Sequence, residues 1–198
     1  PSVVLDLGAN AGEFSFIAAE SGARVIACDV DEGALATLSV RVADRDAKIL
    51  PMKLNLAQPS SAVGWRGREW LGFVERFRGA ADFILCLGLV HHLIVSERVP
   101  LTRLAALFWE LGARDVLLEW VPPDDPRFQE IAGLNVGLYA HLTLDHVVDA
   151  FRPHYRVVAV DALRQSVRSM IHFSWDGASE PVQQDAQCHN DPFFERAP

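Results

Sequence analysis

The chain contains few cysteines, and they are not arranged in pairs. Cys28, Cys86 and Cys188 are odd in number and widely spaced, and no C-x-x-C pair occurs. This pattern indicates neither a disulfide framework nor a zinc site, and we expect a protein of the reducing cytoplasm. His141 and His146 are five positions apart, which does not match two metal ligands on one helix face, so no metal is expected.

Long hydrophobic runs and an excess of positive charge are also absent. No run approaches the roughly 20 residues that cross a bilayer, and no signal peptide precedes the first predicted strand. The 26 acidic residues outnumber the 18 lysines and arginines, so the formal net charge is −8. Neither a membrane nor a nucleic acid is therefore expected as a partner. Because the chain starts at Pro1, without Met and directly before that strand, we expect the full-length protein to have a further N-terminal region.

The composition is that of a globular protein of one domain. Hydrophobic residues make up 50% of the 198 residues and charged residues 22%. Apolar runs alternate with helical patterns, which predicts an α/β domain with a parallel sheet over residues 1–175. The polar stretch 176–198 has no periodicity and is expected to form a flexible C-terminal tail. The predicted strands are 3–7, 24–28, 48–54, 82–87, 114–121, 156–161 and 167–175, and the predicted helices are 12–21, 32–45, 98–112 and a mixed helical region over about 126–152.

The first predicted strand runs into a loop of small residues. Residues 3–7 are apolar apart from Asp6, and Gly8 and Gly12 then permit close backbone approach before a helix. Backbone N–H groups at such a junction can hold a ligand. The Asp6 carboxylate disfavours a phosphate there and suits an ammonium or sulfonium group. The dinucleotide fingerprint G-x-G-x-x-G fits less well because Asn10 replaces its middle glycine, although Asn tolerates left-handed backbone.

This stretch resembles motif I of the class I S-adenosylmethionine-dependent methyltransferases, whose glycine-rich loop wraps the methionine part of the cofactor. The resemblance implies S-adenosylmethionine as the cofactor and a Rossmann-like fold with helices on both faces of the sheet. In that fold a seven-stranded, mostly parallel sheet has the order 3-2-1-4-5-7-6 and an antiparallel last strand. The resemblance assigns this part of the cofactor site to Asp6, Gly8, Ala9, Asn10, Gly12 and Phe14.

The second and third predicted strands also end in polar residues. Asp29 lies about twenty residues after the loop, the spacing of a carboxylate that accepts hydrogen bonds from ribose hydroxyls. The resemblance gives Asp29 this role, with Val30 beside the adenosine; alternatively, Asp29 or Asp31 caps the next helix. It places adenine recognition at Asn55, where the family commonly carries an acid, and Leu56 beside the ring. Asn55 can instead turn the backbone.

Two adjacent histidines follow the fourth predicted strand. Leu87 and Gly88, expected beside the cofactor, lead into His91 and His92 at the carboxyl edge of the sheet. Histidine accepts a proton near neutral pH, so each is a candidate general base. Neighbouring helical residues point about 100° apart, so at most one faces the cofactor, and we favour His91. The alternative is a packing or capping role.

Glu119 ends the fifth predicted strand inside an apolar frame, where an unpaired carboxylate would be costly. It is expected to find a partner. We consider three partners: one of the histidines, which it would orient during catalysis, the methyl acceptor, or an arginine in a salt bridge.

The resemblance extends to a group of bacterial methyltransferases that includes nodulation-associated proteins, and it covers most of residues 3–175. It implies transfer of a methyl group to an unidentified small-molecule acceptor by in-line displacement. The Asn/Asp-Pro-Pro-aromatic motif of amino methyltransferases is absent, which argues against DNA adenine methylation. The residues that carry the resemblance are 4–10, 49–51, 59–60, 64–65, 69, 91–93, 99–101 and 119–122.

The acceptor is expected to be selected by residues 56–80 and 122–150. Four aromatic residues in the first stretch have a spacing that more often marks a core than a substrate pocket, and three residues of the second stretch are candidates to close a pocket. The first set is Trp65, Trp70, Phe73 and Phe77, and the second is Tyr139, His141 and His146. Two other functions stay open: a nicotinamide-dependent oxidoreductase, and a catalytically silent S-adenosylmethionine-binding regulatory module.

Overall fold

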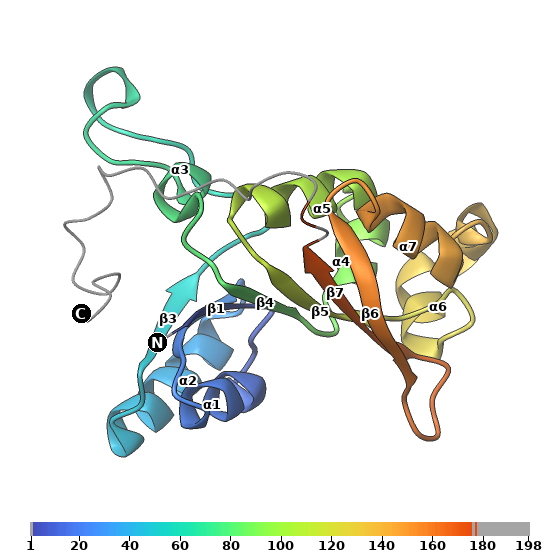
Figure 1. Cartoon of the computed structure of the whole chain (residues 1–198), viewed down its shortest axis with the longest axis horizontal. Coiled ribbons are helices and arrows are strands. Elements are labelled where there is room, and N and C mark those ends of the chain that lie inside the picture. The colour runs from blue at the N-terminus through green and yellow to red at the C-terminus, as the bar shows by residue number, and fades with distance from the viewer. Residues whose placement is uncertain (1, 176, 178–198) are drawn as a thin grey trace.

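A seven-stranded sheet forms the centre of the computed structural model, which describes residues 2–175 and 177 (Figure 1). The strand order is β3-β2-β1-β4-β5-β7-β6, and β7 is antiparallel to both of its neighbours. The strands are β1 (Val3–Leu7), β2 (Arg24–Asp29), β3 (Ile49–Lys53), β4 (Phe83–Cys86), β5 (Asp115–Trp120), β6 (Tyr155–Ala162) and β7 (Ser169–Trp175). The predicted fold class is confirmed, including the position and direction of the last strand.

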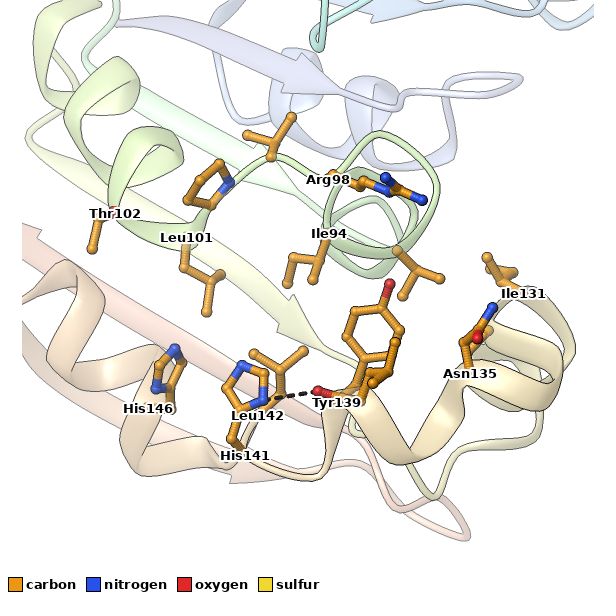
Figure 2. Close-up of a pocket in the computed structure, with 15 residues that line it drawn as sticks. Ile94, Arg98, Leu101, Thr102, Ile131, Asn135, Tyr139, His141, Leu142 and His146 are labelled. Atoms are coloured by element: carbon orange, nitrogen blue, oxygen red, sulfur yellow. Dashed lines mark hydrogen bonds between the residues drawn. The ribbon is translucent and has the colours of Figure 1, made fainter.

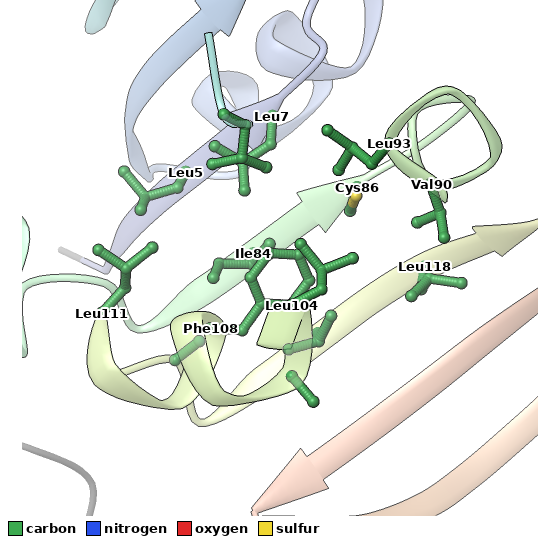
Figure 3. Packing of buried hydrophobic residues seen from close by; sticks show 14 of the residues in the cluster. Leu5, Leu7, Ile84, Cys86, Val90, Leu93, Leu104, Phe108, Leu111 and Leu118 are labelled. Carbon is green, nitrogen blue, oxygen red and sulfur yellow. The ribbon is translucent and has the colours of Figure 1, made fainter. Parts of the chain in front are cut away.

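Helices cover both faces of the sheet because side chains alternate between the faces along each strand. In β1, Val4 packs on the same side as Phe16 and Leu38, while Leu5 points into the opposite cluster. Figure 3 shows that second cluster, where Leu5 and Phe108 gather with other apolar side chains. A strand that is buried on both faces reads as a continuous apolar run, which explains the pattern at residues 3–7.

The helices divide between these two faces. Buried side chains of α1 and α2 belong to one cluster, and buried side chains of α3 to α7 belong to the other (Figure 1). The α-helices are α1 (Glu13–Glu20), α2 (Glu32–Arg45), α3 (Phe73–Phe77), α4 (Val90–Val95), α5 (Leu101–Glu110), α6 (Pro126–Ala132) and α7 (Leu144–Phe151), and the 3₁₀ segments are η1 (Trp65–Gly67) and η2 (Gly133–Tyr139).

Some boundaries differ from those predicted. The helix expected over 98–112 begins at Leu101, because Pro100 takes an extended conformation as its N-cap. The mixed helical region 126–152 contains α6, η2 and α7. Phe73 and Phe77 lie in the core, as their spacing indicates, whereas Trp65 and Trp70 are exposed. Apart from residue 177, the tail expected at 176–198 lies outside the described residues.

Within the described part of the chain, no helix is both long enough and apolar enough to span a bilayer.

Candidate cofactor-binding site

A cavity of about 430 Å³ lies where β1, β2 and β4 end. Parallel strands bring the residues that follow them to one edge of the sheet, which is where open α/β sheets bind ligands. Segments far apart in the sequence meet there. The lining residues are Leu7, Gly8, Asn10, Cys28, Asp29, Val30, Leu54, Asn55, Leu56, Leu87, Gly88, Leu89, His92, Leu93, Ser96 and Glu97.

The loop after β1 is a tight turn that needs left-handed backbone at three positions. Gly8, Asn10 and Gly12 have φ values of 81°, 49° and 83°. The backbone N–H groups of Gly8 and Ala9 both donate to the Cys28 carbonyl at 2.9 Å, which ties the loop to β2. Gly12 is the N-cap of α1, and a Cβ atom there would overlap Leu38. The sequence skeleton of the loop therefore follows from its backbone geometry.

Asp29 joins the loop to the following turn. Its carboxylate accepts hydrogen bonds from the backbone N–H of Asn10 at 2.7 Å and of Asp31 at 2.9 Å. A carboxylate offers about four acceptor positions, so two remain for a ligand in the cavity. The capping alternative belongs to Asp31, whose side chain accepts from Gly33 and Ala34 at the start of α2.

Asp6 lies behind the loop and does not line the cavity. Its side chain is buried and accepts a hydrogen bond from the Ser15 hydroxyl at 2.5 Å. Burial raises the pKa of Asp6 to about 6, although the hydrogen bond from Ser15 acts in the opposite direction. A cationic ligand in the nearby cavity would favour the charged form of this carboxyl. Ser15 is missed by sequence reasoning, because its pairing with Asp6 depends on how α1 packs against β1.

Asn55 lines the cavity and also turns the backbone. Its side-chain oxygen accepts from the backbone N–H of Ala57 at 3.0 Å, so the alternative of a backbone turn is present in the structure. The oxygen has a second lone pair, and the NH₂ group makes no hydrogen bond to another described residue. Leu56, which also lines the cavity, is buried beside it.

The two histidines of α4 have different environments. His92 is exposed and lines the cavity, whereas His91 is 4% exposed and does not line it. The buried Nδ1 of His91 has no hydrogen-bond partner within the described residues. Burial, with smaller effects from His92 and Arg168, lowers the pKa of His91 to about 4. The preference for His91 as the residue facing the cofactor is therefore not supported by the geometry, which places His92 there.

The reason lies in the helical repeat. Residues at i and i+4 share a helix face, and His92, Leu93, Ser96 and Glu97 fall on the face toward the cavity. Ser96 and Glu97 are missed by sequence reasoning, although their spacing from His92 is the signal that finds them once α4 is placed.

Glu119 forms part of an ion-pair network. Arg168 Nη1 donates to Glu119 at 3.1 Å, while its Nε and Nη2 donate to the two carboxylate oxygens of Asp125 at 2.7 and 3.1 Å. The hydrogen bond from Arg168 holds the pKa of Asp125 below its usual range. Of the three partners considered for Glu119, the structure shows the arginine. Arg168 follows Glu119 by 49 positions in the sequence, so local patterns do not reveal the pair.

The other predicted residues are distributed as follows. Ala9 and Gly12 shape the loop without lining the cavity, and Phe14 is exposed on α1. Tyr139, His141 and His146, considered as a wall of the acceptor pocket, line a different cavity. Among residues 2–175 and 177, no three His, Cys, Asp or Glu side chains are grouped so that they could hold a metal ion.

Similarity to a curated protein covers most of the chain. It is 30% identical over 174 residues to nodulation protein NoeA of Rhizobium meliloti (strain 1021), a match that covers 87% of this chain. The chain spans about a third, 36%, of the length of that relative. No family model matches.

Solved structures with similar folds include named methyltransferases. The bifunctional kinase-methyltransferase WbdD has a TM-score of 0.60 at 18% identity, over 88% of this chain and 35% of that one. Magnesium protoporphyrin IX methyltransferase from Synechocystis PCC 6803, solved with bound SAH, has a TM-score of 0.57 at 16% identity, over 88% and 74% of the two chains. The fold of this chain is thus the fold of class I methyltransferases.

Proposed function

We propose that this chain, which has the class I methyltransferase fold and is similar to NoeA over most of its length, is a methyltransferase that uses S-adenosylmethionine to methylate a small molecule. The observation that carries the proposal is the meeting of Asp29 with the Gly8–Gly12 loop at one cavity. A carboxylate beside exposed loop backbone suits a ribose and a cationic amino-acid portion better than a pyrophosphate.

The lining residues divide into parts that match the cofactor. Gly8, Asn10 and Gly88 surround the space for the methionine portion, and Asp29 accepts from the ribose hydroxyls. Asn55 and Leu56 take the adenine side. Asp6 acts from behind the loop as a buried negative charge beneath the cationic part of the ligand. When bound, S-adenosylmethionine supplies an electrophilic methyl group on a sulfonium.

The protein's contribution to transfer is positioning and removal of a proton. Apolar side chains of Leu87, Leu89 and Leu93 limit water at the cavity. His92, on the same wall, accepts the proton that an O–H or N–H acceptor loses, a role worth about 10²–10⁴-fold in rate. Glu119 is held by Arg168 and lies at the edge of the cavity near Gly88. A Cβ atom added to Gly88 would lie 3.6 Å from Glu119 Oε2.

Calorimetric titration with S-adenosylhomocysteine, S-adenosylmethionine and NAD, each added to the purified chain, tests the cofactor assignment. We expect binding of both sulfur nucleosides and none of NAD. Binding of NAD alone would support the oxidoreductase alternative instead.

A matched pair of variants tests the site. Asp29→Ala removes the ribose acceptor, and since a hydrogen bond to a charged group contributes about 1.5–3 kcal/mol, we expect affinity for S-adenosylhomocysteine to fall at least tenfold. Asp44→Ala removes an exposed carboxylate of α2 and should leave the affinity unchanged. Thermal unfolding of both variants controls for the loss of the Asn10 hydrogen bond. Equal affinities in the two variants would contradict the assignment of Asp29.

Transfer of a labelled methyl group from S-adenosylmethionine into pooled small-molecule extracts tests turnover and begins the acceptor search. His92→Gln should reduce incorporation while affinity for S-adenosylhomocysteine is retained. Cofactor binding without incorporation by the unmodified protein would favour the silent regulatory module.

A further inference from the structure

A second cavity, of about 650 Å³, lies between the end of α4 and the segment 131–146 (Figure 2). Ile94, Val95 and Arg98 lie at the end of α4 and just beyond it, and Ile94, two positions after His92, points about 200° away from it around the helix. These three residues line the second cavity together with residues from α5, α6, η2 and the start of α7. The two cavities share no lining residue, so the second is not part of the proposed cofactor site.

The polar side chains that line this cavity can donate hydrogen bonds, and none carries a negative charge. They are Arg98, Thr102, Asn135, Tyr139, His141 and His146, and no Asp or Glu occurs among the described lining residues. This composition is unexpected for a protein with a formal net charge of −8. It favours an anion and disfavours a cation.

The remaining wall is apolar. Leu101 and Leu142 are buried and Ile94 lies beside them, whereas Leu138 is exposed at the rim. The size is within the range of cavities that enclose a small molecule, about 300–1,000 Å³. An apolar ligand body would gain free energy here by leaving water.

Arg98 is placed where its charge is available. It stands in the left-handed backbone region with φ 55°, three positions after the end of α4, and its side chain forms no ion pair with another described residue. Figure 2 shows the Tyr139 hydroxyl directed toward the segment that carries Ile94 and Arg98. A guanidinium and a hydroxyl donor that line the same cavity can bind a carboxylate or phosphate through several hydrogen bonds.

The histidine pair lies across the cavity from Arg98 (Figure 2). His141 Nδ1 is 3.1 Å from the Leu138 carbonyl oxygen, so this nitrogen carries the hydrogen, and Nε2 of the neutral ring is an acceptor. The His141 and His146 rings meet edge to face with centroids 5.3 Å apart. This arrangement gives the cavity an aromatic wall opposite its cation.

We propose that this cavity binds an amphipathic anion, a carboxylate or phosphate carried on an alkyl or aromatic body. The acidic group pairs with Arg98 and Tyr139, and the body packs against the leucines and the histidine pair. The site does not depend on the proposed function, because it shares no lining residue with the proposed cofactor cavity.

Binding of four probes to the protein without cofactor tests this proposal. Decanoate and decyl phosphate share an apolar body and an anionic head, decyltrimethylammonium reverses the charge, and acetate lacks the body. We expect saturable binding of decanoate, decyl phosphate or both by calorimetry below their micelle-forming concentrations, and none of the other two. The tighter of the two anions identifies a carboxylate or a phosphate as the head. Equal binding of decyltrimethylammonium would overturn the proposal.

Variants of residues inside and outside the second cavity distinguish binding of the anion in this cavity from non-specific binding. Arg98→Gln should weaken the affinity for the preferred anion at least tenfold. Arg103 is an exposed residue of α5 outside the cavity lining, and Arg103→Gln should change this affinity less than twofold. Leu138→Asp places a repelling carboxylate at an exposed rim position, where little stability is at risk, and should also abolish binding. Unchanged affinity in Arg98→Gln and Leu138→Asp would overturn the site. Affinity for S-adenosylhomocysteine, measured in the same samples, reports on the proposed function separately.

Discussion

The backbone N–H of Asn10 donates to the Asp29 carboxylate at 2.7 Å, so the loop after β1 is fastened to the end of β2 by a residue that also lines the proposed cofactor cavity. The hydrogen bond joins two positions that are 19 residues apart in the sequence. It gives Asp29 a structural role in addition to the proposed ribose contact. Changes that break this hydrogen bond should therefore affect both loop geometry and ligand affinity.

Replacement of Asn10 tests the geometry of the loop. Asn10→Gly keeps the N–H donor and tolerates φ 49°, so unfolding stability and affinity for S-adenosylhomocysteine should stay near those of the unmodified protein. Asn10→Val forces a β-branched residue into left-handed backbone, which costs about 1–2 kcal/mol or more. Denaturant unfolding and calorimetry measure both effects. Strong loss of affinity in Asn10→Gly would show that the Asn side chain itself is required.

Gly12 and Gly22 form a matched pair for the packing of α1 on α2. Both have positive φ, but an added Cβ would overlap Leu38 only at Gly12 and would meet nothing within 4 Å at Gly22. Gly22→Ala should show the backbone strain alone. Gly12→Ala should lose a further amount of about 1–3 kcal/mol, the usual cost of overpacking, in chemical unfolding. Equal losses would mean that Leu38 moves aside without cost.

His91 should reduce stability in acid. Its pKa is about 4 in the folded protein and 6.5 as a free group, so the unfolded chain binds more protons between these values. Stability from this residue is present above about pH 6.5 and is lost as the pH falls toward 4, by up to about 3 kcal/mol. His91→Leu removes this effect. The unfolding free energy of the variant, relative to that of the unmodified protein, should therefore rise as the pH falls from about 6.5 to about 4. A constant difference across the window would contradict the buried, neutral state of His91.

Asp6 should act in the opposite direction. Its pKa is about 6 in the folded protein and 3.8 as a free group, so the folded protein binds more protons between these values. The destabilisation is therefore complete above about pH 6 and disappears below about pH 4. Asp6→Asn keeps an acceptor for the Ser15 hydroxyl and should gain stability relative to the unmodified protein as the pH rises through this window. Thermal unfolding at several pH values measures the difference, and a difference independent of pH would contradict the raised pKa.

The Arg168 network should hold the β6–β7 hairpin against β5 and α6. Arg168→Met leaves Glu119 and Asp125 without their cation, and we expect a loss of about 2–4 kcal/mol in denaturant unfolding. Arg164→Met, on the same hairpin connection and exposed, should change stability by less than about 0.5 kcal/mol. Similar losses in the two variants would assign the effect to the hairpin in general and not to the ion pairs.

Local patterns predicted the strands and the longer helices in their order along the chain, but gave no bounds for the short helices α3 and α4. The apolar run at residues 3–7, the glycines of the following loop and the acid at Asp29 predicted a cavity-lining turn at the carboxyl edge of a parallel sheet, and the structure brings them together there. Strand order came from the family resemblance and is confirmed. These features could be predicted because hydrophobic periodicity and turn chemistry are properties of neighbouring residues.

The roles of individual polar side chains were decided by tertiary structure. The adjacent histidines are equivalent in sequence, and only the packing of α4 buries His91 and turns His92 toward the cavity. Asp6 reads as a ligand contact but lies behind the loop on Ser15, while Arg168 reaches Glu119 across 49 positions. The sequence by itself determined the framework of strands, loops and helices. The burial, charge and partners of its polar groups depend on contacts between distant segments, which form only when the chain folds.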